Sequence, residues 1–200
     1  MINHKEIRND IEIFLDFLEK NLPEKKIYVE KFKKYHEKII KENEKMSLVS
    51  KKDIYLIARK HFLDSVLISN FIEEKEISDI GSGAGFPGII ISILNPDKRV
   101  YLIERNLKKS IFLKEVKIIL SLENVKVIRE DILNMQEIPG DAFVSRAANY
   151  KKILKILKDK NIKDKNFYAV LPFKENIKEK FYIIENPLTK ENFKLLKIKI

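Results

Sequence analysis

The chain has 200 residues, of which 44% are hydrophobic and 35% charged, the ordinary composition of a globular domain with a sizeable core. It contains no cysteine, which excludes disulfides and a cysteine nucleophile, and its three histidines lack metal-ligand spacing, so we expect no metal site. No apolar run approaches the roughly 18 residues of a membrane span and no signal core begins the chain, so we expect a cytoplasmic protein without membrane contact.

The net charge is +10, and the excess lies near the C-terminus, where residues 146–200 carry 15 basic and 6 acidic side chains. A strongly basic segment favours a polyanionic partner such as nucleic acid. Lysine outnumbers arginine 34 to 6, which drifting surface codons in an AT-rich genome would also produce. Charge alone leaves both explanations open.

The first 75 residues predict helices, because their apolar residues recur with the helical period and no glycine interrupts them. Pro23 separates the first two helices, and Asp53 is expected to cap the third. We therefore predict a helical extension over residues 1–75 that packs on a main domain over residues 76–200. The three predicted helices span residues 7–22, 27–46 and 53–72.

The remaining chain alternates between strand and helix patterns, which predicts an α/β fold with a mostly parallel sheet. The connection between the last two strands is too short for a crossover helix, so we expect them to form an antiparallel hairpin. The predicted strands span 76–80, 99–104, 124–131, 141–146, 166–172, 181–186 and 192–200. The predicted helices span 88–94, 107–122 and 150–160.

A glycine-rich loop joins the first strand to its helix. The segment DIGSGAGFPG, residues 79–88, holds four of the five glycines of the chain. Glycine lets a ligand approach the backbone closely, and a helix start offers free N–H groups at the carboxyl edge of the sheet. A tight turn with close packing is the alternative, but it would need only one glycine, so the loop favours ligand binding. Its glycines are Gly81, Gly83, Gly85 and Gly88.

The spacing of the glycines narrows the choice of ligand. A dinucleotide fingerprint would put its third glycine at Phe86, and a phosphate-binding Walker loop would need a lysine that is absent. GxGxG after Asp79 resembles the cofactor loop of class I S-adenosylmethionine-dependent methyltransferases. That resemblance implies that Glu104, at the end of the next strand, holds the ribose hydroxyls. It also implies that the segment 131–133 contacts the adenine.

Several further segments resemble one methyltransferase family, RsmG, also called glucose-inhibited division protein B. The resemblance implies the class I (Rossmann-like) methyltransferase fold and methylation of N7 of a guanine in the decoding-region loop of 16S ribosomal RNA. It extends from about residue 30 onward in one register. The matching segments are DIGSGAGFPG, KHFLDS (60–65), NLKKSIFL (106–113), FVSRA (143–147) and FYAV (167–170).

The family resemblance implies a set of cofactor contacts, which the loop pattern extends. The predicted S-adenosylmethionine-binding residues are Asp79, Gly81, Gly83, Gly85, Phe86, Glu104, Ile132, Leu133 and Arg146. Three departures from the family affect the substrate side more than the cofactor side. They are Ser47-Leu48-Val49 in place of Asn-Leu-Thr, Asp131 in place of a frequent arginine, and Leu171-Pro172 in place of Lys-Gly, for which Lys174 is a possible substitute.

The implied chemistry needs no general base, because guanine N7 carries a lone pair and no proton. Catalysis would then rest on positioning, and Arg146 is the best candidate for a catalytic contact. His61 and Asp64 share a helix face and are expected to form a local pair that braces the glycine loop. Lys108 and Lys109 begin a helix, where the dipole disfavours cations, which indicates either a phosphate contact or ordinary exposed lysines.

Aromatic side chains are the other candidates for RNA contact, because single-stranded bases stack on them. Core packing is the expected role for most of the four, which are Phe143, Phe167, Tyr168 and Phe173. The expected partner is 16S ribosomal RNA or the small ribosomal subunit, bound by a monomer. Two alternatives stay open: a methyltransferase for a small molecule or protein, and a catalytically inactive RNA-binding relative.

Overall fold

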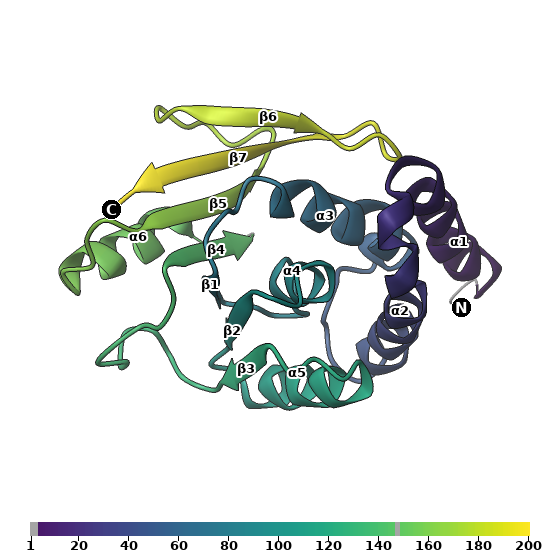
Figure 1. The fold of residues 1–200 in the computed structure, drawn as a ribbon, viewed down its shortest axis with the longest axis horizontal. Helices are drawn as coiled ribbons and strands as arrows, with labels where there is room; N and C mark the ends of the chain where they lie inside the picture. Colours follow the sequence, from purple (N-terminus) through teal and green to yellow (C-terminus); the bar gives the residue numbers. More distant parts are fainter. Residues whose placement is uncertain (1–3, 147–148) are drawn as a thin grey trace.

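The computed structural model describes residues 4–146 and 149–200. Within them a seven-stranded sheet has the order β3-β2-β1-β4-β5-β7-β6 (Figure 1). The first five strands are parallel, and β7 runs antiparallel to both of its neighbours. The expected α/β fold with a C-terminal antiparallel hairpin is therefore confirmed. The strands are β1 (Glu76–Ile80), β2 (Arg99–Ile103), β3 (Val125–Ile128), β4 (Ala142–Arg146), β5 (Asn166–Pro172), β6 (Phe181–Glu185) and β7 (Asn192–Lys199).

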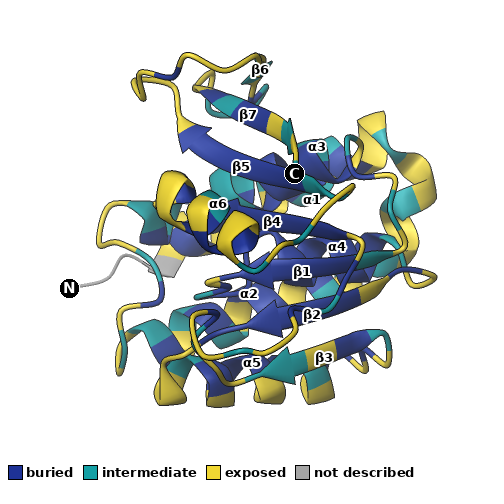
Figure 2. Cartoon of the chain, turned by 90° about the vertical axis from the view of Figure 1, so that its left-hand side faces the viewer, coloured by how far each residue is buried: buried dark blue, intermediate teal, exposed yellow. Residues whose placement is uncertain are grey.

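The central strands are buried on both faces, as parallel strands covered by helices on each side must be. Figure 2 shows β1 and β4 as a buried band in the middle of the molecule. One hydrophobic core includes Val144 and Tyr168 and packs beneath α4 (Gly88–Leu94) and α5 (Leu107–Ile119). The other core includes Phe143 and Phe167 and packs beneath α6 (Tyr150–Asp159). Successive residues of these strands therefore point to opposite faces of the sheet and pack into different cores.

The N-terminal helices share the first of these cores. α1 (His4–Asn21) is followed by a 3-10 helix, η1 (Pro23–Tyr28), and then by α2 (Val29–Asn43). Rings of α1, α2 and the segment before α3 meet at centroid distances of 5.2 Å between Phe14 and Phe32 and 5.7 Å between Phe14 and Phe62. The second predicted helix therefore begins at Val29 rather than at residue 27, because Pro23 first starts a 3-10 turn.

The third predicted helix is not one continuous α-helix. It consists of a 3-10 helix η2 (Asp53–Tyr55), a π-helical segment η3 (Ile57–Phe62) and α3 (Leu63–Ser69). Asp10 of α1 caps the π-helical segment by accepting the N–H groups of Ala58 at 2.7 Å and Arg59 at 3.2 Å. This distant carboxylate satisfies the orphan N–H groups that a helix start leaves, a role that the sequence assigned to Asp53.

Candidate functional site

The glycine loop follows β1 and turns directly into α4, as the sequence predicted. Gly81, Gly83 and Gly85 all have positive φ angles, of 75°, 57° and 99°. A Cβ at Gly85 would lie 2.5 Å from the Tyr35 hydroxyl, whereas a Cβ at Gly81 would meet nothing within 4 Å. Gly85 is therefore required for close packing against α2, and Gly81 stands beside open space.

Several backbone N–H groups of this loop are bonded within the protein. Those of Gly81 and Ser82 donate to the Ile103 carbonyl at 2.9 and 3.1 Å, and that of Gly85 donates to the Ser82 carbonyl. The Gly88 N–H donates to the Asp79 carboxylate at 3.0 Å. These four N–H groups are therefore not available to a ligand, because neighbouring carbonyls and a carboxylate accept them.

Asp79 supports the glycine loop from inside the protein by accepting the Gly88 N–H. Its side chain is fully buried, and Oδ1 has no hydrogen-bond partner. Burial raises the pKa of Asp79 to about 7, because an apolar environment disfavours the charged form. Nearby, the Tyr35 hydroxyl of α2 donates to the Ala84 carbonyl at 2.5 Å. The N-terminal helices thus hold the loop in place through Tyr35.

Glu104 links the loop to the end of β2. Its Oε2 accepts the Gly83 N–H at 2.9 Å, and its Oε1 accepts the Asn106 N–H at 2.8 Å. The Asn106 side chain in turn accepts the Lys109 N–H and caps α5. This arrangement orients a largely buried carboxylate beside the loop, at the position the sequence predicted.

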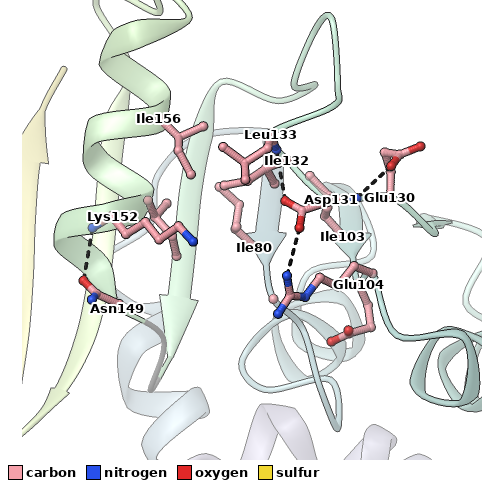
Figure 3. Close-up of a pocket in the computed structure, with 13 residues that line it drawn as sticks. Ile80, Ile103, Glu104, Glu130, Asp131, Ile132, Leu133, Asn149, Lys152 and Ile156 are labelled. Carbon is pink, nitrogen blue, oxygen red and sulfur yellow. Dashed lines mark hydrogen bonds and ion pairs between the residues drawn. The ribbon is translucent and has the colours of Figure 1, made fainter.

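A first cavity of about 290 Å³ opens at the ends of β1 and β2 (Figure 3). It includes four of the predicted binding residues, Gly81, Glu104, Ile132 and Leu133. Sequence reasoning missed its α6 wall. The start of that helix, marked by Asn149 as a capping residue, was the available signal. Its remaining lining residues are Ile80, Ile103, Arg105, Glu130, Asp131, Asn149, Lys152, Ile153 and Ile156.

A second cavity of about 560 Å³ lies at the same edge of the sheet, beyond the end of β4. Arg146 lies here rather than in the first cavity. Its Nη2 donates to Asp64 Oδ2 at 2.6 Å, and its Nη1 donates to the His61 carbonyl at 3.3 Å. The cavity is lined by Asp53, Lys60, His61, Asp64, Arg146, Val170, Leu171, Pro172, Phe173, Lys174, Glu191, Asn192 and Phe193.

The expected local pair of His61 and Asp64 does not form. The Asp64 carboxylate accepts from Arg146 and, at 2.7 Å, from the Asn186 side chain. His61 instead stacks on Phe86 at a centroid distance of 5.2 Å. The helix face is shared as predicted, but stronger donors from distant segments occupy the carboxylate. Phe86 therefore braces the loop against the N-terminal helices, outside both cavities.

The remaining candidate residues lie in different parts of the molecule. Phe143, Phe167 and Tyr168 are fully buried, which confirms the core role expected for them, whereas Phe173 is half-exposed and lines the second cavity. Lys108 and Lys109 begin α5 and line neither of the two cavities. Ala147, the last residue of the FVSRA segment, lies outside the described residues.

In residues 4–146 and 149–200, no helix is long and apolar enough to cross a membrane. The same residues contain no group of three or more His, Cys, Asp or Glu side chains that is placed to hold a metal ion.

Solved structures with a similar fold identify the class of protein. An S-adenosylmethionine-dependent O-methyltransferase from Thermotoga maritima aligns with a TM-score of 0.50 at 16% identity, over 81% of this chain and 71% of its own. A precorrin-6y C5,15-methyltransferase from Geobacter metallireducens aligns with a TM-score of 0.52 at 13% identity, over 78% and 92%. At these identities the likeness concerns the fold, and the chain has the class I methyltransferase fold.

The sequence comparisons identify the family. The family model described as rRNA small subunit methyltransferase G matches residues 28–193. The ribosomal RNA small subunit methyltransferase G of Mycoplasma capricolum is 34% identical over 190 residues, which cover 93% of this chain and 81% of that protein. The chain belongs to the rRNA small subunit methyltransferase G family, which confirms the family resemblance of its motifs.

Proposed function

We propose that this protein transfers the methyl group of S-adenosylmethionine to N7 of a guanine in the decoding-region loop of 16S ribosomal RNA. Family membership supports the proposal, and Glu104 is the observation that carries it for this chain. The Glu104 carboxylate lies on the wall of the first cavity and accepts the Gly83 N–H at 2.9 Å. Each of its oxygens keeps a further lone pair for a ribose hydroxyl.

The other walls of the first cavity suit an adenosine. Apolar side chains line this cavity on two sides, one formed by the strand ends and one by α6. A flat heterocycle could lie between them. Leu133 is half-exposed, and its N–H donates to the Asp131 carboxylate at 3.1 Å, which shapes the turn that would border the base. The N–H groups of Gly81 and Gly83 are occupied, so their carbonyl oxygens are the backbone groups that these two residues would offer to the amino-acid end. The apolar wall residues are Ile80, Ile103, Ile132, Ile153 and Ile156.

The bound cofactor would supply an activated methyl group, which is the difficult part of the chemistry. The protein must then hold guanine N7 in line with that group and exclude water. Arg146 is our candidate for a residue that touches the acceptor, because it ends β4 and lies in the second cavity. Asp79, Gly85 and Phe86 would contribute by keeping the loop in shape rather than by touching the cofactor.

The proposal also includes the setting of the reaction. The protein would act as a cytoplasmic monomer on 16S ribosomal RNA or the small ribosomal subunit. Residues 76–200 would form the catalytic domain, and residues 1–75 a helical extension that supports its loop through Tyr35. Lys174 lines the second cavity, where it would compensate for the missing Lys-Gly pair of the family.

The direct test maps N7-methylguanine in 16S RNA from cells with and without the gene. Borohydride and aniline cleave RNA at this modification, and primer extension locates the cut. We expect one cleavage site in the decoding-region loop to disappear with the gene. It should return with the wild-type gene but not with Glu104→Ala, while Glu123→Ala, at the opposite edge of the sheet, should restore it.

Other outcomes would replace the proposal. An unchanged cleavage pattern, together with labelled methyl transfer to a small molecule or protein, would favour a different acceptor. An unchanged pattern with RNA binding but no detectable binding of S-adenosylmethionine would favour an inactive RNA-binding relative.

A further inference from the structure

The second cavity lies next to the proposed methyl-transfer site. Arg146 ends β4, Pro172 ends β5, and Phe193 pairs with Pro172 at the start of β7. All three therefore sit at the edge of the sheet where β1 enters the glycine loop. Because β4 is the direct neighbour of β1, a molecule in the second cavity would lie beside that loop, across β4 from the first cavity.

Two kinds of wall enclose this cavity. One is apolar and partly aromatic, formed by the end of β5 together with Phe173 and Phe193. The other is polar, formed by side chains from residues 53–64 and by Arg146. A flat heterocycle with hydrogen-bonding edges fits such a site, because apolar walls hold its faces and polar groups read its edges.

Most charges on the polar wall already have partners. Arg146 and Asp64 are 2.6 Å apart. Lys60 lies 3.3 Å from Asp53 Oδ1 and 3.0 Å from Glu191 Oε2. These pairs leave little net charge on the wall, so a neutral base suits it better than a free anion would.

His61 is the part of this wall whose polar atoms have no hydrogen-bond partner, and Asp53 lies beside it. His61 Nε2 lies 3.7 Å from Asp53 Oδ2, too far for a hydrogen bond. Both ring nitrogens of His61 are buried without a hydrogen-bond partner. Asp53 Oδ2 accepts the Ser50 hydroxyl at 2.8 Å, which leaves lone pairs on both oxygens. The remaining lone pairs of Asp53 and the unpartnered His61 nitrogens make this corner suited to a ligand that carries hydrogen-bond donors.

The protonation states agree with that role. Burial is the main cause that lowers the pKa of His61, and Arg146 adds to it, so the imidazole is neutral near pH 7. His61, the Ser50 hydroxyl that donates to Asp53 and the Lys60 ammonium group beside it together lower the pKa of Asp53, so the carboxylate remains ionised and acts only as an acceptor. A carboxylate of this kind favours two adjacent donors and repels an acceptor.

We propose that the second cavity holds the acceptor guanine and that Asp53 reads its N1–H and 2-amino donors. Adenine presents an acceptor at N1 and no 2-amino group, so the same carboxylate would reject it. Lys60, paired with Asp53, is placed to donate to O6 on the same edge of the base. Recognition through this edge leaves N7 free for the methyl group. The inference rests on the proposed function and adds the residue that selects the base.

The test compares two RNA substrates that differ by one amino group. Small-subunit particles are reconstituted with the target guanosine intact or replaced by inosine, which keeps N1–H, O6 and N7 but lacks the 2-amino group. The wild-type kcat/KM should fall roughly 10- to 100-fold on inosine, the effect of one lost hydrogen bond to a charged group. Asp53→Asn should lose activity on guanosine and reduce this discrimination to less than threefold.

Two control measurements keep the test decisive. The affinity for S-adenosylhomocysteine should be the same in Asp53→Asn and wild type, because Asp53 lies outside the first cavity. Glu191→Gln removes the other carboxylate beside Lys60 and should keep the guanosine-to-inosine ratio. A wild-type ratio near one, or an Asp53→Asn variant that keeps the full ratio, would overturn the inference. Absence of wild-type methylation on guanosine would instead overturn the proposed function.

Discussion

The two cavities differ in how their charged side chains are held. Arg105 and Asp131, at the first cavity, are 3.0 Å apart, but the Arg105 side chain is 76% exposed. Arg146 and Asp64, at the second cavity, are 2.6 Å apart, with side chains only 13% and 7% exposed. The same kind of ion pair therefore serves two purposes. At the first cavity it is an exposed contact at the rim, and at the second it is part of the folded core.

The second cavity is also tied to more distant parts of the chain. The fully buried Asn186, in the turn between β6 and β7, donates to Asp64 Oδ1 at 2.7 Å and to the Arg59 carbonyl at 2.8 Å. Its own side-chain oxygen accepts the N–H groups of Leu188 and Thr189. The C-terminal hairpin thus holds Asp64, and Asp64 holds Arg146. Geometry at this cavity depends on the whole fold.

The largest expected effect comes from breaking the buried pair. Arg146→Ala leaves the Asp64 carboxylate buried without its cation, which should cost about 3–5 kcal/mol of unfolding free energy. Arg105→Ala removes an exposed pair and should cost less than about 1 kcal/mol. Urea denaturation of both variants measures the difference. Arg146 is also the candidate for a catalytic contact, so Arg146→Ala is expected to impair methyl transfer. The buried contact adds a loss of stability to that expectation.

A second variant separates stability from catalysis at this position. Adding Asp64→Asn to Arg146→Ala removes the stranded charge, so stability should partly return while methyl transfer stays low. Equal stability losses for Arg146→Ala and Arg105→Ala would contradict the contrast between the two cavities.

The next effect compares Gly85, which is closely packed, with Gly81, which faces open space. Gly85→Ala would force a methyl group against the Tyr35 hydroxyl and Ile89 Cγ1, at 2.5 and 2.6 Å, and should cost roughly 2–4 kcal/mol. Gly81→Ala meets open space and has only the positive φ to oppose it, so about 1 kcal/mol is expected. Thermal unfolding of the two variants gives this order.

Cofactor binding should not follow that order. Gly81 lines the first cavity and Gly85 does not, so the folded Gly81→Ala protein should bind S-adenosylmethionine more weakly than wild type by calorimetry. Unchanged affinity in Gly81→Ala would argue against Gly81 as a contact. A Gly85→Ala protein as stable as wild type would show that Tyr35 does not pack against the loop.

Sequence reasoning succeeded where the determinants are local. Glu104 follows a buried strand, and strand ends meet at one edge of a parallel sheet, so its place beside the glycine loop could be predicted. Arg146 could be placed at that edge for the same reason. Its direction could not be predicted, because that depends on Asp64, 82 residues away. The start of the π-helical segment was missed because its cap, Asp10, comes from another helix 48 residues earlier.

The last expected effect is the pH dependence of Asp79, which accumulates over several pH units rather than arising from one substitution. The pKa of its carboxyl is raised from 3.8 to about 7 in the folded protein, so between these values the folded state binds more protons than the unfolded state. Stability should therefore fall as pH rises from about 4 to about 7, by at most about 1.4 kcal/mol per pH unit, and level off above. Asp79→Asn cannot ionise, yet its amide oxygen can still accept the Gly88 N–H.

Denaturation of wild type and Asp79→Asn between pH 4 and pH 8 measures the contribution of this group as a difference in slope. Asp53 is the matched control from the second cavity, because its pKa is lowered on folding. The stability it contributes is lost only as pH falls below about 4, so Asp53→Asn should keep the wild-type slope in this range. If Asp79→Asn also kept that slope, the Asp79 carboxylate would be ionised in the folded protein, and another cation or donor would have to stabilise it beneath the loop.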